Sequence, residues 1–489
     1  MRRLSGLDAG FLSLETPNSH MHVASLYVYD PATVDGGYSF ERVKQLVANR
    51  LHLLAPFRWR LVEVPFGLHH PIWIEDPDFD LDNHIRPVTL PAPGDDQALA
   101  ELAGKFMSGR LDRSRPLWEM WFVDGLAGGK VAILSKTHHA AIDGVSGAEL
   151  TANLLDVSPE TVIHPPPDPP WAPDPVPTEA EMLAYAINSI IRQPAKLADT
   201  LRRAVGSAVS GHDGSSGSDA VASAGLFRAP RTSFNGPISG DRVFAFTSVA
   251  LEEIKRVRAA HGGTVNDVVL ALCAGALRRY LLDREELPSD PLVAMVPISV
   301  RTEDQKSTMG NRVSNMFVAM HTNVGDPVER FRRIRHASAE AKTRATASAA
   351  PTIADWAEFA APAIAASAAR LYASLRLAER VRPLFNLTIS NVPGPSIPLY
   401  SAGARMIAWY PMGPIFDGIG LNITVMSYMG VMHFGLVADR ESVPNASQIA
   451  DYVADALREL LAPANGDSAP AKPPARKAPT KQRTIPTDV

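Results

Sequence analysis

The sequence predicts a mixed α/β fold arranged in two lobes of similar size, and three observations support this. Apolar runs rich in β-branched residues alternate along the chain with longer stretches of helical periodicity. A chain of 489 residues is too long for one ordinary globular core. A segment rich in proline, and then in glycine and serine, interrupts the alternation and leaves a similar pattern on each side.

The expected strands are apolar runs of about six residues, a length that suits strands covered on one or both faces. In chain order they span residues 24–29, 118–123, 131–136, 292–298, 314–320, 384–390, 420–427 and 431–437. The expected helices carry apolar residues at helical spacing and span residues 40–51, 96–107, 264–282, 328–345, 354–381 and 447–461. Ser447 is the expected N-cap of the last helix, whose apolar face contains Ile449, Tyr452, Val453, Leu457 and Leu460.

The segment rich in proline, and then in glycine and serine, defines the expected domain boundaries. Nine prolines between residues 158 and 178 favour extended polyproline geometry, and residues 206–225 have the composition of a flexible linker. Between them, apolar residues recur at helical spacing around Pro194. We therefore expect an N-terminal lobe (1–157), a connector with one helix (158–235), a C-terminal lobe (236–463) and a disordered basic tail (464–489).

Composition and charge narrow the functional classes. The formal charge of −4 argues against a nucleic-acid-binding protein, which needs a dominant basic face. The single cysteine, Cys273, excludes an intramolecular disulfide, favours a reducing compartment, and lies in an apolar helix where a core role is expected. No apolar stretch has the length of a signal peptide or a membrane span, so we expect any membrane contact to be peripheral. The basic tail is expected either to touch anionic lipid or only to solubilise the chain.

One group of residues carries candidate chemistry: His138 and His139, which follow an apolar run, and Asp143 and Gly144, which come soon after. Adjacent side chains on a strand point to opposite faces, so one histidine should face reactants while the other packs into the structure. That geometry argues against a metal site built on the two rings, and none is expected. Asp143 is expected to accept a hydrogen bond from a histidine or an arginine, and Gly144 to allow close approach of a substrate. The other pair, His69-His70, has no following Asp-Gly and is interpreted as part of a loop.

The string His138-His139-x-x-x-Asp143-Gly144 resembles the active-site motif of the bacterial wax ester synthase/acyl-CoA:diacylglycerol acyltransferase (WS/DGAT) family. This family belongs to the CoA-dependent acyltransferases, together with chloramphenicol acetyltransferase and non-ribosomal condensation domains. Further segments resemble the family's signatures in the expected order: residues 4–11, 116–118, 266–267, 296–301, 310–311, 388–395 and 420–424. Met320-His321-Thr322 departs from the Leu-Pro-Thr expected at that place, and the connector and basic tail are additions.

The resemblance implies two chloramphenicol-acetyltransferase-like lobes with a tunnel at their interface. It also implies transfer of a long-chain fatty acyl group from acyl-CoA, a co-substrate used without a further cofactor, to diacylglycerol, giving triacylglycerol. A long-chain fatty alcohol, giving a wax ester, is the second acceptor considered. Two alternatives stay open: another acceptor or a carrier-protein donor, and a non-catalytic protein that binds lipid or lipid inclusions.

The family also implies roles for individual residues. His139 is the expected general base, since an imidazole with a pKa near 6.5 can take a proton close to neutral pH, and His138 is then its packed partner. Asn266, at the start of a helix, is either an oxyanion donor or a neighbour of a plain capping pair formed by Thr264 and Asp267. The residues expected to contact substrate are Ser390, Asn391, Pro116 and Trp118.

A water-insoluble acceptor implies a cytoplasmic protein that is peripheral to the inner membrane or to lipid inclusions. The apolar segment 354–381, which contains Trp356 and Phe359, is a candidate docking helix. Packing of the same face into the core is the competing interpretation.

Overall fold

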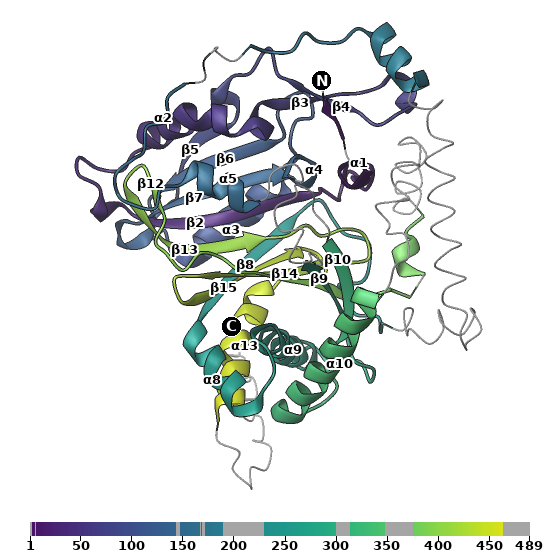
Figure 1. The fold of residues 1–489 in the computed structure, drawn as a ribbon. Coiled ribbons are helices and arrows are strands. Elements are labelled where there is room, and N and C mark those ends of the chain that lie inside the picture. The colour runs from purple at the N-terminus through teal and green to yellow at the C-terminus, as the bar shows by residue number, and fades with distance from the viewer. Residues whose placement is uncertain are drawn as a thin grey trace, which may run out of the picture.

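Two six-stranded sheets, one in each lobe, organise the described part of the chain (Figure 1). The structure is a computed structural model, and it describes residues 2–4, 6–142, 147–166, 168, 172–188, 229–299, 313–347, 375–380 and 382–462. We call the lobe that contains the sheet of β2 (His22–Asp30) the N lobe, and the lobe that contains the sheet of β8 (Arg242–Ala250) the C lobe. The mixed α/β class with two lobes predicted from the sequence is confirmed.

The N-lobe sheet has the strand order β12-β13-β2-β7-β6-β5. Its strands from the first half of the chain are β2 (His22–Asp30), β5 (Ile85–Thr89), β6 (Trp118–Asp124) and β7 (Val131–His138). On one face, α2 (Phe40–Arg50) and α5 (Gly147–Leu154) cover Tyr29, Phe122 and Ile133. On the other face, α3 (Asp96–Ser108) shares a core cluster with Phe244 and Val437 of the C lobe. This second face is therefore the one that meets the C lobe.

The remaining elements of the N lobe lie at its edge. A small sheet joins β1 (Arg2–Arg3), β4 (Ile72–Glu75) and β3 (Trp59–Val62). Helix α1 (Gly6–Ser13) packs beside the four-residue helix α4 (His139–Ile142), which begins directly after β7. The chain thus changes from strand to helix between the two histidines of the motif.

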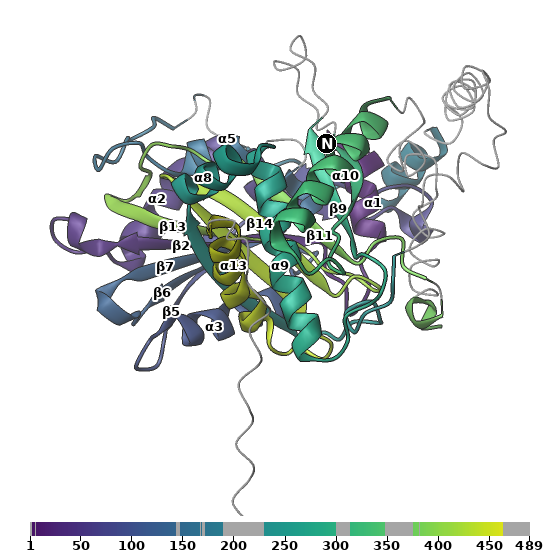
Figure 2. The same cartoon turned by 90° about the horizontal axis from the view of Figure 1, so that it is seen from below.

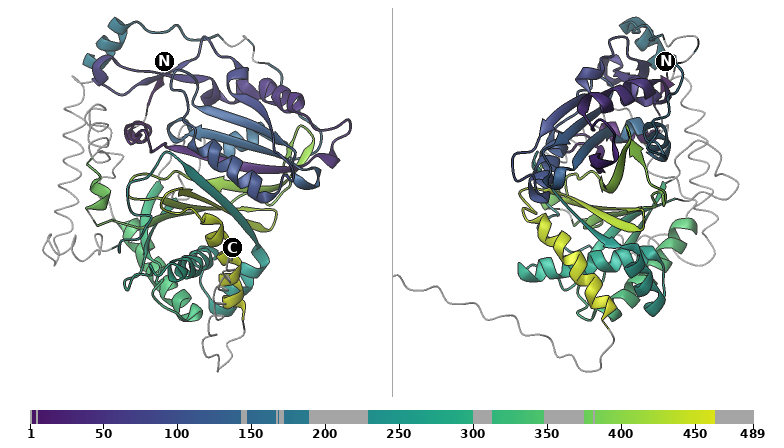
Figure 3. Two further views of the ribbon diagram at one scale, coloured as in Figure 1. Left: turned by 180° about the vertical axis from the view of Figure 1, so that it is seen from behind. Right: turned by 90° about the vertical axis from the view of Figure 1, so that its left-hand side faces the viewer.

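The C-lobe sheet has the strand order β10-β9-β11-β14-β15-β8. The strands are β8 (Arg242–Ala250), β9 (Val293–Ser299), β10 (Val313–Ala319), β11 (Leu387–Val392), β14 (Leu421–Tyr428) and β15 (Val431–Asp439). Four helices pack on the face away from the N lobe: α8 (Leu251–His261), α9 (Val265–Asp283), α10 (Pro327–Ala347) and α13 (Ala446–Leu461) (Figures 2 and 3). Burial of α9 on nearly every side explains its almost continuous apolar sequence.

The lobes do not follow the simple division into residues 1–157 and 236–463. Strands β12 (Tyr400–Ser401) and β13 (Ala404–Met412) leave the C-terminal half and extend the N-lobe sheet, with β13 antiparallel to β2 (Figure 1). The crossing strand lies so close to β15 that a Cβ at Gly435 would be 1.8 Å from the carbonyl oxygen of Pro411. Only glycine fits there without displacing a strand. The expected boundaries are corrected accordingly: the second half of the chain contributes to both lobes.

All eight expected strands are confirmed, with ends that shift by up to three residues. Five of the six expected helices are also confirmed, as α2, α3, α9, α10 and α13. Ser447 as an N-cap was wrong, because α13 begins at Ala446 with Asn445 at the N-cap position. Elements that the sequence analysis did not predict include α1, α8, β3, β4, β5, β8 and β13.

Three predictions concern parts of the chain that the structure describes little or not at all. Residues 354–374 and 381 of the candidate docking segment lie outside the described residues, and residues 375–380 form a turn and the 3-10 helix η8 (Leu377–Glu379). In the connector, residues 179–188 are helical, whereas residues 189–228 lie outside the description. The tail 464–489 lies outside it entirely.

Candidate active site

The two histidines of the motif occupy different elements and different environments. His138 is the last residue of β7 and is only 1% exposed. His139 is the first residue of α4 and is less completely buried. The change from strand to helix between them separates the rings, so they do not converge on one point.

His138 makes two specific contacts through its ring. Its Nδ1 accepts a hydrogen bond from the backbone N–H of Ala140 at 3.0 Å, which requires an Nδ1 without a proton. Its Nε2 lies 3.1 Å from Oε1 of Glu15. The ring therefore carries its proton on Nε2, the nitrogen that lies beside the Glu15 carboxylate, although the angle there falls short of a hydrogen bond.

Glu15 lies in the loop after α1, and it is a residue that sequence reasoning missed. Arg113 donates to Oε2 of Glu15 from Nη2 at 2.6 Å and from Nε at 3.1 Å. Burial raises the pKa of Glu15, but the contact with His138 and the guanidinium of Arg113 outweigh it and lower that pKa to about 2. The carboxylate is thus ionised at any pH at which the protein would work.

His139 is held by its backbone and by an aromatic ring. Its N–H donates to the carbonyl oxygen of Met21 at 2.8 Å. Its imidazole stacks on Phe11 of α1, with ring centroids 3.9 Å apart and an interplanar angle of 27°. Phe11 and Met21 therefore both contact His139, which the motif alone does not reveal.

The other predicted N-lobe residues divide into two groups. Asp143 and Gly144 lie outside the described residues. Pro116 is buried, and Trp118 is stacked between Phe57 and His84, with its indole N–H donating to the Phe57 carbonyl at 2.8 Å. Trp118 belongs to the core cluster on the sheet face covered by α2, and this cluster also includes Met426 and Tyr428 of β14. Trp118 therefore packs in the core of the N lobe, and its predicted contact with substrate, like that of Pro116, stays a prediction.

Two of the three predicted C-lobe residues, Asn266 and Asn391, are in contact. Thr264 and Asp267 form the expected capping pair of α9, as a capping box. The side chain of Asn266 then accepts a hydrogen bond at Oδ1 from Nδ2 of Asn391, at 3.4 Å. Ser390 points to the opposite face of β11, because Asn391 shares its face with residues packed against α9.

Two family models match this chain in succession. The model described as wax ester synthase/diacylglycerol acyltransferase catalytic domain matches residues 4–269, which include the histidine pair. The model described as WS/DGAT C-terminal domain matches residues 309–461. The chain belongs to the WS/DGAT family. The resemblance found in the sequence is confirmed. As a member of this family, the protein is an acyltransferase of lipid metabolism.

Individual WS/DGAT proteins match over almost the whole chain. A Mycobacterium tuberculosis protein named "putative diacylglycerol O-acyltransferase" is 36% identical over 473 residues, covering 94% of this chain and 90% of its own. The solved structure of the wax ester synthase/diacylglycerol acyltransferase from Marinobacter aquaeolei VT8 is 31% identical with a TM-score of 0.66, covering 94% and 98%. The first condensation domain of the calcium-dependent antibiotic synthetase shares the fold alone, at 14% identity and a TM-score of 0.53, covering 95% and 97%.

A loop of this WS/DGAT chain connects the histidine site to the C lobe. Asn18, in the loop that carries Glu15, donates from Nδ2 to the carbonyl of Ile238 at 3.0 Å. In return, the buried guanidinium of Arg242 donates to the carbonyl of Asn18. Both lobes therefore hold the loop that contacts His138.

Among the described helices, none is long and apolar enough to cross a bilayer.

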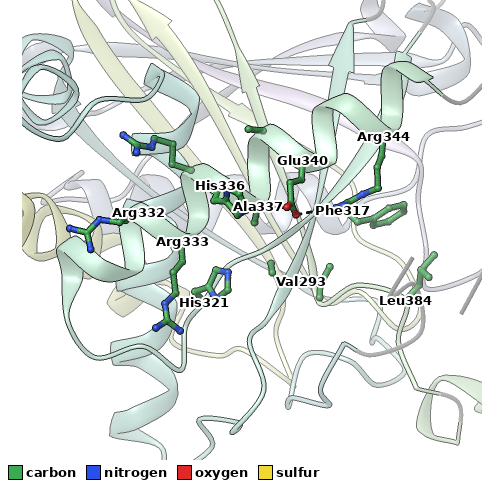
Figure 4. A pocket seen from close by; sticks show the side chains of 13 residues that line it. Val293, Phe317, His321, Arg332, Arg333, His336, Ala337, Glu340, Arg344 and Leu384 are labelled. Atoms are coloured by element: carbon green, nitrogen blue, oxygen red, sulfur yellow. Dashed lines mark ion pairs between the residues drawn. The ribbon is translucent and has the colours of Figure 1, made fainter. Parts of the chain in front are cut away.

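A separate pocket of about 990 Å³ lies beside α10, at the β10 edge of the C-lobe sheet (Figure 4). Phe317 lines the pocket together with four arginines, of which Arg332 and Arg333 pair with Glu329, Arg344 pairs with Glu340, and Arg335 donates to the carbonyl of His261. His321, from the segment that departs from the family pattern, also lines it and has a φ of 46°. None of the predicted site residues that the structure describes lines this pocket.

Buried histidines should make stability depend on pH. His433 on β15 is 3% exposed, and neither ring nitrogen has a hydrogen-bond partner within the described part of the chain. Burial lowers the pKa of His433 to about 4, so below pH 7 the unfolded chain takes up a proton that the folded protein excludes. Stability should therefore fall as the pH decreases from 7 to 5, by about 2 kcal/mol from this residue.

Urea unfolding of wild type and His433→Leu at pH 7 and pH 5 measures this contribution. The variant should lose less stability on acidification than the wild type by that amount. His336→Gln, a change at an exposed histidine, serves as the control. Equal pH dependence of wild type and His433→Leu would contradict the prediction.

Proposed function

We propose that this WS/DGAT protein transfers a long-chain fatty acyl group from acyl-CoA to the hydroxyl of diacylglycerol, with His139 as the general base. The observation that carries the proposal is the contrast between the two histidines. His138 is sealed in a cluster with Glu15 and Arg113, whereas His139 begins a new helix and is less buried. Of the two histidines, His139 is therefore the one positioned to exchange a proton with the reactants.

The reaction needs one proton to move twice. A thioester is an activated donor, but a neutral hydroxyl is a poor nucleophile, so a base must accept its proton as the oxygen attacks the carbonyl. In this proposal His139 takes that proton, the C–O bond forms, and the tetrahedral intermediate expels the CoA thiolate as the C–S bond breaks. The imidazolium then returns the proton to the thiolate. A positioned base of this kind typically contributes 10²–10⁴-fold to the rate.

Asn266 supplies the donor for the oxyanion in this scheme. Because Nδ2 of Asn391 donates to Oδ1 of Asn266, the NH₂ group of Asn266 is directed away from Asn391 and remains able to donate. The positive end of α9 adds to the stabilisation of a negative charge nearby. Ser390 remains a candidate contact to substrate on the other face of β11. Asp143 and Gly144 keep their predicted roles in holding the turn and admitting the substrate.

Diacylglycerol is the proposed acceptor because the Mycobacterium relatives carry that activity in their names. A fatty alcohol is the second candidate, because the Marinobacter protein is named for both activities. Acyl-CoA is the proposed donor because the matched family model describes an acyltransferase catalytic domain. We propose a peripheral location at the membrane or at lipid inclusions, where such acceptors are found.

An acceptor panel tests this function. Purified protein is incubated with radiolabelled palmitoyl-CoA and, separately, diacylglycerol, hexadecanol or hexadecylamine, and the products are separated by thin-layer chromatography. Labelled triacylglycerol is expected, with wax ester as a second product. Labelled amide without any ester would overturn the assignment to an alcohol acceptor. Binding of acyl-CoA without any product would favour a non-catalytic lipid-binding protein.

A further inference from the structure

We propose that Glu15 is a positioning residue, which holds His139 in place through His138, and that Arg113 fixes Glu15. This inference rests on the proposed function only in taking His139 as the reacting group. The chain of contacts runs from Arg113 to Glu15, from Glu15 to His138, and from His138 to the backbone beside His139.

The first step is the immobilisation of the Glu15 carboxylate. Its side chain is 8% exposed, and both of its oxygens are engaged. Oε2 accepts from two nitrogens of Arg113, while Oε1 faces His138 at 3.1 Å and His22 at 3.9 Å. Arg113 is anchored in turn by donating to the carbonyl of Leu12 at 3.1 Å. No oxygen of Glu15 is left over for a substrate, so the residue acts through its protein partners.

The second step is the choice of tautomer at His138. A carboxylate at Nε2 favours the proton on that nitrogen and leaves Nδ1 as an acceptor. Without the carboxylate, the ring could place the proton on Nδ1, where it would face the N–H of Ala140 and repel it. Glu15 therefore keeps His138 in the form that can accept from the backbone.

The third step is the capping of the turn that carries His139. The first N–H groups of a helix have no partner within the helix. His138 directly precedes α4, and its Nδ1 accepts from Ala140, the second residue of that helix. This is the position and contact of an N-cap side chain. Because His139 lies between the cap and the capped N–H, its backbone is held on both sides.

A direct test compares Glu15→Gln with wild type and with Glu63→Gln. Glu63 also faces Arg113, at 3.6 Å, but its side chain is 62% exposed and contacts no histidine of the site, which makes it a matched control. Glu15→Gln should lower kcat about 10- to 100-fold with little change in KM for acyl-CoA, the range seen when a partner that orients a functional histidine is removed. Arg113→Gln should have a smaller effect in the same direction. Full activity of Glu15→Gln would overturn the proposal.

Two further readouts separate positioning from a general loss of structure. His138→Asn keeps a capping side chain before α4, so adding Glu15→Gln to that variant should cost little further activity. Multiplying losses would contradict action through His138. The ¹⁵N chemical shifts of His138 should report the Nε2–H tautomer in wild type and in Glu63→Gln, and a shift toward Nδ1–H in Glu15→Gln. This spectrum can be read even if the wild type makes no ester, so failure of the proposed function and failure of this inference are distinguishable.

Discussion

His139→Ala should lower kcat by about 10²–10⁴-fold while leaving the affinity for acyl-CoA close to that of the wild type. The imidazole is proposed to act only when the hydroxyl loses its proton, and it contributes little to binding the donor. An interaction made only in the transition state lowers kcat and kcat/KM together when it is removed. Steady-state kinetics with diacylglycerol, combined with calorimetric titration of acyl-CoA, measure both quantities.

The second histidine pair provides the control for this experiment. His69 stands next to His70 as His138 stands next to His139, but its ring packs against Tyr185 at the edge of the N lobe. His69→Ala should therefore retain nearly full activity. If His139→Ala kept more than a tenth of the wild-type kcat, or if both variants lost activity equally, His139 would not be the general base.

Gly435→Ala should destabilise the protein by about 3 kcal/mol, at the upper end of the range for overpacking. The new Cβ would lie 1.8 Å from the Pro411 carbonyl oxygen, and both atoms belong to strands that cannot rotate away. Either β13 or β15 must move, and these strands hold the N-lobe sheet against the C lobe. Denaturant unfolding measures the change in free energy, and the acyl transfer rate reports whether the lobes still meet correctly.

Gly236→Ala is the matched control, because a Cβ at that position would meet nothing within 4 Å. Its stability should stay within about 0.5 kcal/mol of the wild type. A Gly435→Ala protein as stable as the control would mean that the crossing strand does not lie against β15 as described.

The sequence predicted the elements whose own pattern reports their structure. Strands β14 and β15 are long runs of apolar and β-branched residues buried on both faces, and α9 is apolar on nearly every side. Strand β13 was missed because Arg405 and Pro411 break its pattern, and because its partner β2 lies far away in the sequence. Pairing between distant strands cannot be seen in a local pattern.

In the site, too, features that depend on neighbouring residues could be predicted, whereas contacts between distant segments could not. The histidine pair could be found because its residues are adjacent, and the pattern also indicated that the rings would point different ways. Glu15 was missed because its role depends on Arg113, 98 positions further along, and on a strand that ends at His138. The stacking of Trp118 on Phe57 and His84 was not predicted, because membership in a motif does not say which face of a strand a side chain occupies.

The central claim is that His139 acts as a base and that the acyl group passes directly from CoA to the alcohol. Rapid-quench analysis of the protein with radiolabelled acyl-CoA, first without and then with diacylglycerol, tests this claim most directly. We expect no label on the protein at any time and labelled triacylglycerol only after the acceptor is added. An acylated protein that forms before the acceptor is added, and then passes its label to diacylglycerol, would contradict the claim.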